Sequence, residues 1–290
     1  MKKTILVTGG CGFIGSSLCK ELADQGNHVI SLDNYFTGSR ENQHWAVDYY
    51  EGNTEDLFYI WSTEMQMPDI DIIFHLGEYS RVEQSFRDYN KVMAFNYASF
   101  PVVCEFANML AAKLVYSGSS TKFSVGEDGK TMSPYAYTKA QNTEFLKAYS
   151  SWNELDYAIV YFYNVYGDNE IATGQYATVV AKFLNMVKEG DTDLPVTAPG
   201  TQLRNFTHIN DITSGLILAG LKGHGDGYGI GSPQKYSILN LVKLLGCKPL
   251  MAGRVAGNRM DGELMTDKIK ELGWTAKHTL EEYINAKFNI

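Results

Sequence analysis

Short runs of apolar residues alternate with longer segments of helical spacing along the first half of the chain. Apolar runs of four to six residues are typical of buried parallel strands, whereas an i, i+3, i+4 pattern is typical of helices. A sequence in which predicted strands alternate with predicted helices is typical of an α/β fold, in which helices cover a parallel sheet. The expected strands are Thr4–Thr8, His28–Asp33, Ile70–Leu76 and Lys113–Ser117, and the expected helices are Phe13–Gln25 and Asn90–Leu110.

The second half of the chain has a less regular pattern. A helix is predicted over Ser133–Trp152, because Ser-Pro is a favourable helix entry, and a β-rich run follows at Tyr157–Tyr166. We expect a further helix at Gly174–Glu189 and a loop at Gly200–Asp211 that leads into a strand and a turn. The glycine-rich segments Gly223–Gly231 and Gly246–Gly262 predict a smaller C-terminal lobe with long connections.

Composition narrows the class of protein. A length of 290 residues suits one large domain or two small ones, and 44% apolar residues are enough for a buried core. A formal net charge of -8 argues against a nucleic-acid groove, which needs clustered Lys and Arg. An anionic small molecule can still bind where a few arginines converge.

The cysteines and the length of the apolar segments indicate the cellular compartment. Cys11, Cys19, Cys104 and Cys247 form no CxxC pair and have no histidine at metal-ligand spacing, which favours reduced thiols and no metal site. No apolar segment approaches the ~20 residues of a membrane span. We therefore expect a cytoplasmic protein that binds neither a membrane nor nucleic acid.

A glycine motif lies between the first predicted strand and helix. Gly10-Cys11-Gly12-Phe13-Ile14-Gly15 matches G-x-G-x-x-G in the strand-to-helix context of a Rossmann-type dinucleotide site. Asp33 ends the next strand, where a carboxylate can accept the ribose hydroxyls of NAD and would repel a 2′-phosphate. Arg40 is the residue nearby that could favour NADP instead. The alternative interpretation is an ordinary glycine turn and a surface aspartate.

Tyr135 and Lys139 are four residues apart at the start of a predicted helix and would project from one face. A free phenol is protonated at neutral pH, but a nearby ammonium and a cationic nicotinamide favour the phenolate, which is a competent general base. The same spacing arises by chance in a chain with 19 tyrosines. The hydroxyl-rich turn that precedes the pair, Ser117-Gly118-Ser119-Ser120-Thr121, favours a catalytic role for Tyr135 and Lys139 over a chance match.

Taken in order, these motifs resemble the NAD-dependent epimerase/dehydratase family of extended short-chain dehydrogenases/reductases, the UDP-glucose 4-epimerases in particular. The resemblance also covers Leu32-Asp33-Asn34, His75-Leu76, Tyr163-Asn164-Val165-Tyr166-Gly167 and Arg204-Asn205-Phe206-Thr207-His208. It implies NAD as cofactor, a UDP-sugar or other nucleotide sugar as substrate, and a homodimer formed through Asn90–Leu110 and Ser133–Trp152. It further implies a doubly wound Rossmann domain over 1–166, joined by 206–232, and a substrate-binding lobe over 167–205 and 233–290.

The resemblance also implies roles for individual residues. Tyr135, Lys139 and Thr121 would be catalytic, with Thr121 contacting the sugar O4 and Lys139 the nicotinamide ribose. The residues expected to bind the cofactor are Gly9, Gly12, Phe13, Ile14, Asp33, Asn34, Asn53, Leu76, Tyr135 and Lys139. Those expected to bind the substrate are Ser119, Thr121, Tyr135, Asn164, Arg204 and Arg254, the last three at the diphosphate. For each arginine, a solvated surface cation is the alternative.

Departures from the family pattern bear on the reaction. Family dehydratases commonly carry an acid directly after the hydroxyl residue, whereas Lys122-Phe123-Ser124 follow Thr121 here, so we expect 4-epimerisation. A 4,6-dehydratase or 4-ketoreductase is the alternative enzyme, and a catalytically silent NAD-binding protein is the alternative of another class. Gly77-Glu78 replaces the usual Ala-Ala, and Asn53 and Tyr161 replace an acid and an arginine. Lys122 and Glu78 would either lie near the substrate pocket or form a surface ion pair.

Overall fold

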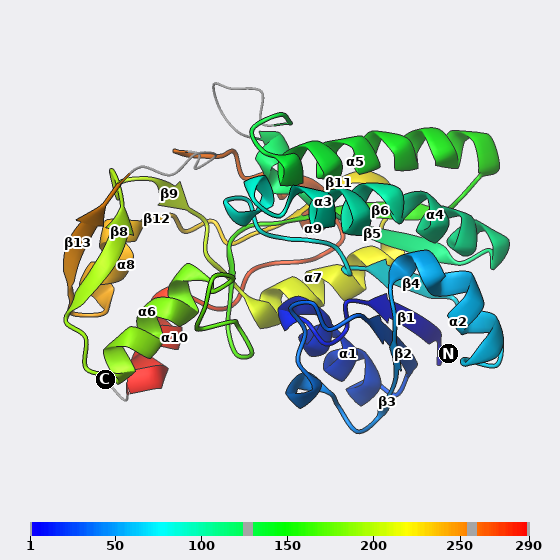
Figure 1. Cartoon of the computed structure of the whole chain (residues 1–290), viewed down its shortest axis with the longest axis horizontal. Coiled ribbons are helices and arrows are strands. Elements are labelled where there is room, and N and C mark those ends of the chain that lie inside the picture. Colours follow the sequence, from blue (N-terminus) through cyan, green and yellow to red (C-terminus); the bar gives the residue numbers. More distant parts are fainter. Residues whose placement is uncertain (1, 124–129, 254–259, 289–290) are drawn as a thin grey trace.

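The central feature is a seven-stranded parallel sheet, seen in a computed structural model that describes residues 2–123, 130–253 and 260–288, with only the backbone at 122 and 123 (Figure 1). Its strand order is β11-β6-β5-β4-β1-β2-β3, and every neighbouring pair is parallel. The strands are β1 (Thr4–Thr8), β2 (His28–Asp33), β3 (Val47–Glu51), β4 (Ile72–His75), β5 (Lys113–Ser119), β6 (Tyr157–Phe162) and β11 (Gly225–Ile230). This is a doubly wound Rossmann-type sheet, as predicted.

Helices cover both faces of this sheet because successive side chains of a strand point to opposite sides. Ile5 and Val7 of β1 belong to one core, which they share with helices α1, α7 and α9, while Leu6 belongs to a second core with helices α2, α4 and α5. The helices are α1 (Phe13–Asp24), α7 (Ile209–Lys222), α9 (Asp267–Glu271), α2 (Leu57–Thr63), α4 (Phe100–Met109) and α5 (Pro134–Asn153). Both faces are therefore buried, which explains the continuous apolar runs of the strands.

The predicted elements agree closely with this sheet. Strands at Thr4–Thr8 and His28–Asp33 have the predicted bounds, and α5 begins at Pro134 with the hydroxyl of Ser133 accepting from the Ala136 amide. The helix predicted over Asn90–Leu110 is interrupted. It consists of α3 (Tyr89–Val92), a π-helical turn (Met93–Ala98) and α4, whose first turn contains Pro101, because proline has no amide hydrogen to continue the ladder.

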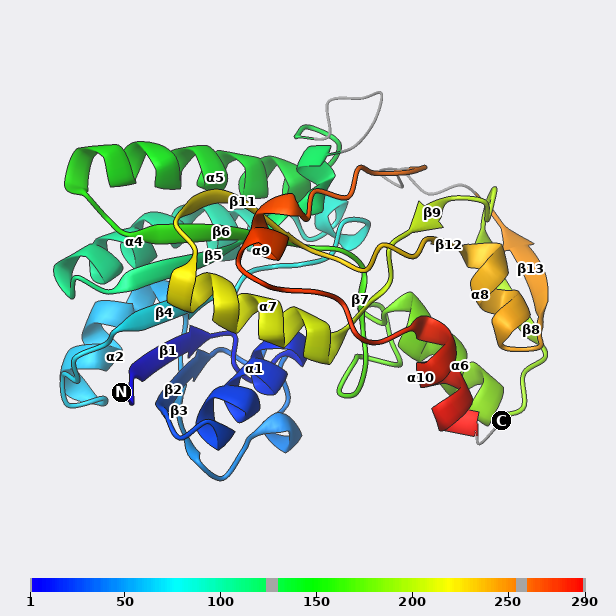
Figure 2. The same ribbon diagram turned by 180° about the vertical axis from the view of Figure 1, so that it is seen from behind.

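A second group of elements packs at one end of the molecule and is seen from behind in Figure 2. Its core contains Tyr166, Phe183, Val196, Leu241 and Ile284. Its helices are α6 (Val179–Lys188), α8 (Ile238–Leu244) and α10 (Leu280–Phe288). Three two-stranded sheets pair β7 (Val165–Tyr166) with β10 (Thr207–His208), β9 (Leu203–Arg204) with β12 (Tyr236–Ser237), and β8 (Asp193–Thr197) with β13 (Lys248–Ala252).

Three predictions for the second half were wrong in detail. The segment expected as a loop at Gly200–Asp211 contains β9 and β10 and leads into helix α7, not into a strand and a turn. Helix α6 begins at Val179 and not at Gly174, after Thr178 in an extended conformation. The glycine-rich segment Gly223–Gly231 does not belong to the smaller lobe, because it carries β11 of the main sheet. Its glycines allow close packing: a β-carbon on Gly229 would lie 1.9 Å from the carbonyl oxygen of Met265. The division into 1–166 with 206–232, against 167–205 with 233–290, stays a prediction.

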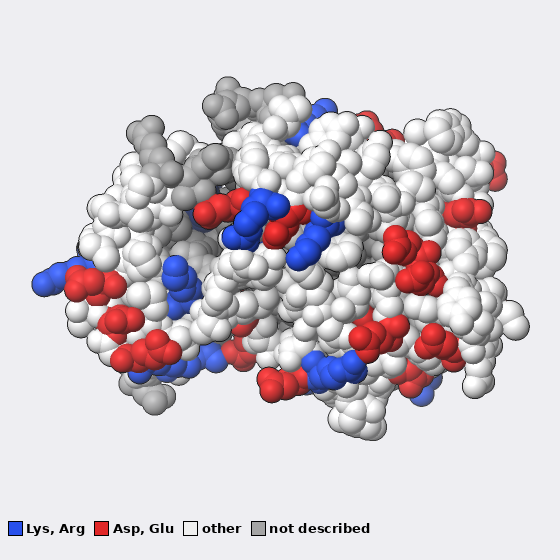
Figure 3. Space-filling view, viewed as in Figure 1, with Lys and Arg blue, Asp and Glu red and all other residues white. Residues whose placement is uncertain are grey.

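The surface carries charges of both signs. Figure 3 shows them spread over this face of the molecule, with Lys and Arg beside Asp and Glu next to a hollow near its middle. Among the described helices, none is both long and apolar enough to cross a membrane. The residues that the structure describes also contain no cluster of three His, Cys, Asp or Glu side chains placed to hold a metal ion.

Candidate active site

The glycine motif forms the turn between β1 and α1. Gly9 has a φ of +74°, and a β-carbon there would lie 2.8 Å from the backbone of Gly77 at the end of β4. Gly12 is the N-cap of α1 and has no side chain that could accept from the first-turn amides. Backbone amides that face a pocket at a helix start are the arrangement that binds a pyrophosphate.

Asp33 lies at the end of β2, facing the same turn. Its two carboxylate oxygens accept from the Cys11 and Tyr35 amides, each at 2.8 Å. Burial raises the pKa of the Asp33 carboxyl, although these amides act in the opposite direction. Arg40, which could have favoured NADP, is exposed and forms an ion pair with Glu51. The residues present fit NAD better than NADP.

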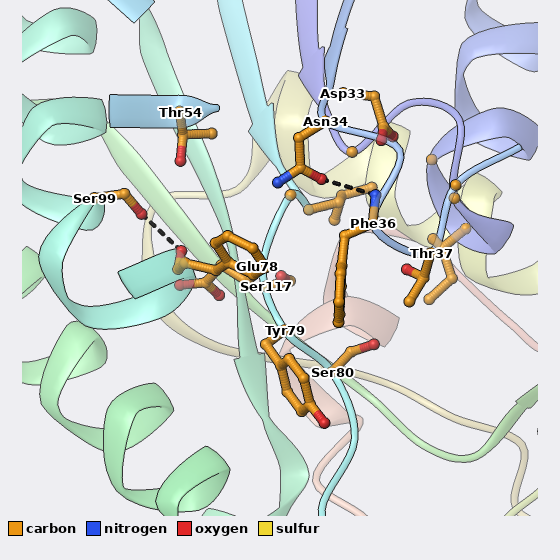
Figure 4. Close-up of a pocket in the computed structure, with 18 of the residues that line it drawn as sticks. Asp33, Asn34, Phe36, Thr37, Thr54, Glu78, Tyr79, Ser80, Ser99 and Ser117 are labelled. Atoms are coloured by element: carbon orange, nitrogen blue, oxygen red, sulfur yellow. Dashed lines mark hydrogen bonds between the residues drawn. The ribbon is translucent and has the colours of Figure 1, made fainter. Parts of the chain in front are cut away.

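One pocket connects the glycine turn with the Tyr–Lys pair. All ten residues expected to bind the cofactor line it, including Asp33 at one end and Tyr135 and Lys139 at the other. Figure 4 shows Asp33 and Asn34 on one side of this cofactor pocket and Glu78 and Ser117 on the other. The helix start at Ser133 therefore places Tyr135 and Lys139 on one face, as the four-residue spacing predicted.

Lys139 is buried in a polar cluster at the end of β4 and β5. Its ammonium donates to the Glu78 carboxylate and, at 2.7 Å, to the Ser117 carbonyl oxygen. Asn142 donates to the other Glu78 oxygen at 2.8 Å. Of the two alternatives for Glu78, a surface position was wrong, because its side chain is 1% exposed and pairs with Lys139. The side chain of Lys122 lies outside the described part.

A second pocket adjoins the first and shares Tyr135 with it. Five of the six residues expected to bind the substrate line this substrate pocket, and they are Ser119, Thr121, Tyr135, Asn164 and Arg204. The sixth, Arg254, lies outside the described residues. The hydroxyl oxygens of Ser119 and Thr121 lie 2.9 Å apart at the end of β5. Asn164 adopts a φ of +35°, which separates β6 from β7 within the predicted β-rich run.

Two charged residues near Tyr135 were not predicted. Arg81 follows β4 and lines both pockets, and its Nε donates to the Tyr176 carbonyl oxygen at 2.9 Å. Glu170 follows β7 and accepts from the Gly167 amide at 2.9 Å and from the Thr178 hydroxyl. Burial raises the pKa of Glu170 to about 7. Their position after the carboxyl ends of strands, where α/β sheets bind ligands, is a signal that could have identified them.

Together, the sheet order, the glycine turn and the Tyr–Lys pair at one pocket define an NAD-binding Rossmann enzyme of the short-chain dehydrogenase/reductase type. Comparison with known families agrees with this class. The chain belongs to the NAD dependent epimerase/dehydratase family, whose pattern matches residues 5–231. The predicted family, fold class and cofactor are thereby confirmed.

Relatives of the chain cover nearly its whole length. It is 27% identical to the UDP-glucose 4-epimerase of Lactobacillus helveticus, over 94% of this chain and 92% of that protein. It is 28% identical to a UDP-N-acetyl-alpha-D-glucosaminuronate decarboxylase of Bacillus cytotoxicus, over 84% and 79%. The crystal structure of the Thermotoga maritima UDP-glucose 4-epimerase with UDP-glucose superposes with a TM-score of 0.91 at 27% identity, covering 99% of this chain and 97% of that one.

Proposed function

We propose that the protein is a nucleotide-sugar 4-epimerase, with a UDP-sugar as substrate. The observation that carries this proposal is the place of Tyr135, which lines both the cofactor pocket and the substrate pocket. A base at that junction can reach a sugar hydroxyl whose carbon faces the cofactor. The epimerase relatives support the assignment of the reaction.

In the proposed reaction, NAD held by the residues of the cofactor pocket would supply the hydride acceptor, and later the hydride donor, for C4 of the sugar. Tyr135 removes the O4 proton as the hydride leaves, which gives a 4-keto sugar, and it returns that proton after the sugar has presented its opposite face. Lys139 lies on the same helix face and holds a positive charge near the phenol. Ser119 and Thr121 offer hydroxyls to O4, and their 2.9 Å contact can relay the proton.

Binding of the nucleotide diphosphate is assigned to Asn164, Arg204 and Arg254. Asn164 and Arg204 line the substrate pocket. An anionic diphosphate needs local positive charge in a protein with a net negative charge, and the arginines would supply it. The ten residues that the sequence predicted to bind the cofactor, all of which line the cofactor pocket, are assigned to NAD binding. We further propose a cytoplasmic homodimer formed through the helices of residues 89–109 and 134–153.

A 4,6-dehydratase is the second candidate, and Glu170 is the observation that favours it. Elimination of water needs a further proton-transfer group, and a carboxyl with a pKa of about 7 can both donate and accept a proton near neutral pH. Glu170 lines the substrate pocket together with Tyr135. A reductase or decarboxylase would begin with the same oxidation or hydride transfer at C4 and differ in its product.

Product analysis separates these candidates. The purified protein is incubated with NAD and UDP-, GDP-, CDP- or dTDP-sugars, and the sugar protons are followed by NMR. A C4 epimer without net NADH supports the epimerase, whereas a 4-keto-6-deoxy sugar supports the dehydratase and net NADH consumption the reductase. The Tyr135→Phe variant should lose about 10²–10⁴-fold in turnover while still binding NAD. Normal turnover by that variant, or no turnover on any sugar despite NAD binding, contradicts the proposal.

A further inference from the structure

The Glu78 carboxylate occupies a buried site where the family pattern has an alanine. It contacts the Lys139 ammonium, the Asn142 amide at 2.8 Å and the Tyr116 hydroxyl at 3.4 Å, while His75 Nε2 lies 3.8 Å away. Its side chain is 1% exposed, yet the residue lines the cofactor pocket beside Ser117 (Figure 4). The carboxylate is therefore part of the wall at the Tyr–Lys end of that pocket.

Glu78 is ionised in this site. Burial alone would raise the pKa of the Glu78 carboxyl, but Lys139 and His75 lower it, and the net direction is below the ordinary value. The donors from Asn142 and Tyr116 both reach one carboxylate oxygen, and Lys139 reaches the other. A buried charge of this kind is tolerated because it is paired and hydrogen-bonded.

Lys139 is correspondingly constrained. An ammonium has three hydrogens, and its acceptors here are the Glu78 carboxylate, the Ser117 carbonyl oxygen at 2.7 Å and the Ser117 hydroxyl at 3.4 Å. Glu78 thus fixes the position of Lys139 and balances its positive charge. Without Glu78, the end of the pocket next to Tyr135 would carry one more positive charge.

That charge balance acts differently on the two forms of the cofactor. The nicotinamide ring is cationic in NAD⁺ and neutral in NADH, so an unbalanced ammonium in the same pocket opposes NAD⁺ and leaves NADH nearly unaffected. We propose that Glu78 is a positioning residue that holds Lys139 and, by its charge, makes the site favour NAD⁺ over NADH. The inference rests on NAD binding and not on the proposed sugar reaction. In a 4-epimerase, the same preference would favour return of the hydride to the 4-keto sugar.

The test compares the dissociation constants of NAD⁺ and NADH by titration calorimetry at pH 7.5. Glu78→Gln removes the charge and keeps the shape, and we expect it to lower the ratio of NAD⁺ affinity to NADH affinity about ten-fold. Glu55→Gln is the matched control, since Glu55 lines the same pocket among the residues after β3 and is exposed. That control should leave the ratio within about two-fold of wild type, because exposed charges are screened.

Three more variants make the outcome decisive. Glu78→Asp keeps the charge and should restore the preference for NAD⁺, while Glu78→Gln with Lys139→Gln removes both charges and should return the ratio toward wild type. Thermal unfolding establishes that each variant is folded. Should Glu78→Gln not fold, Glu78→Ala carries the test, since family members have alanine there. An unchanged ratio in the charge-removing variant, or equal weakening of both cofactors, overturns the proposal, whether or not any sugar is turned over.

Discussion

Gly15 packs directly against Gly9: a β-carbon added to Gly15 would lie 2.0 Å from the Gly9 carbonyl oxygen. Helix α1 can therefore approach the end of β1 only because residue 15 has no side chain. The Gly12 amide donates to the same carbonyl oxygen at 3.1 Å. These contacts close the turn between β1 and α1.

Gly15→Ala should destabilise the fold. The new methyl group meets backbone atoms, which cannot move aside as a flexible side chain could, so we expect the free energy of unfolding to fall by about 1–3 kcal/mol. Urea unfolding followed by circular dichroism measures this change. An unfolding curve that superposes on the wild-type curve would show that α1 shifts freely and that the packing argument is wrong.

Gly12→Ala should behave in the opposite way. Its φ of -76° suits any residue, and the nearest atom to the new β-carbon is the Gly9 carbonyl oxygen at 3.3 Å, so stability should change little. Gly12 lines the cofactor pocket, however, and a methyl group there obstructs close approach of a pyrophosphate. We expect NAD affinity to fall at least about ten-fold in calorimetry. Wild-type affinity in this variant would remove Gly12 from the proposed cofactor site.

Asp33→Asn should reduce the preference for NAD over NADP. The substitution removes the negative charge that would oppose a 2′-phosphate and keeps one oxygen for the Cys11 or Tyr35 amide. We expect the ratio of NAD to NADP affinities to fall about ten-fold, measured by titration with both cofactors. Arg40→Gln serves as the control and should leave the ratio unchanged, since Arg40 already pairs with Glu51.

The sequence predicted elements whose pattern is local and regular. Buried strands such as β1 and β2 stand out because both faces are apolar, whereas β3 was missed: Asp48 and Glu51 are exposed at the sheet edge, so its pattern is not a buried run. The edge strand β11 was hidden for another reason. Its sequence, GDGYGI, has the composition of a loop, and only packing against Met265 and Tyr163 makes glycine favourable there.

In the site, too, the sequence predicted local relationships but not contacts between residues far apart in the chain. Tyr135 and Lys139 could be paired from the sequence because four residues make one helical turn. Glu78 could not be paired with Lys139, because 61 residues separate them and the ends of β4 and β5 bring them together. Arg81 joins the two pockets for a similar reason, through a loop whose path depends on the carbonyl of Tyr176. Spacing rules do not extend to such contacts.

The proposed homodimer predicts which exposed aromatic residues lie in the dimer interface. Tyr97, on the π-helical turn, and Tyr137, on α5, are more than 40% exposed, and both belong to the helices expected at the interface. Light scattering at micromolar concentration should give twice the 32.4 kDa chain mass for the wild type. Tyr97→Glu combined with Tyr137→Glu should give the monomer, because charges are unfavourable in a buried interface.

Trp45 provides the control for that experiment. Its side chain is 92% exposed between β2 and β3, outside the helices expected at the interface. Trp45→Glu removes an aromatic residue that is more exposed than Tyr97 or Tyr137 and should leave the dimer intact. A monomeric wild type, or dissociation by the Trp45 variant alone, would contradict the assignment of the interface.

Glu170 should make stability fall as the pH rises through neutrality. Burial raises the pKa of Glu170 from 4.5 to about 7, so the folded state binds a proton more tightly than the unfolded state. The stabilisation is fully present below pH 4.5 and is lost as the pH passes through about 7, a change of roughly 3 kcal/mol. Glu170→Gln has the same shape and cannot titrate, so its unfolding free energy should lack this component.

Urea unfolding of both proteins at intervals between pH 5 and 8 tests the sign as well as the size. The wild type should lose stability relative to Glu170→Gln across this range, because burial opposes the ionised carboxylate more than the Thr178 hydroxyl, the Gly167 amide and Arg81 stabilise it. If the difference between the two curves is constant, Glu170 titrates normally and cannot serve as a neutral-pH acid in the substrate pocket. If the difference grows in favour of the wild type, Arg81, which lines the same pocket, stabilises the carboxylate more than burial opposes it.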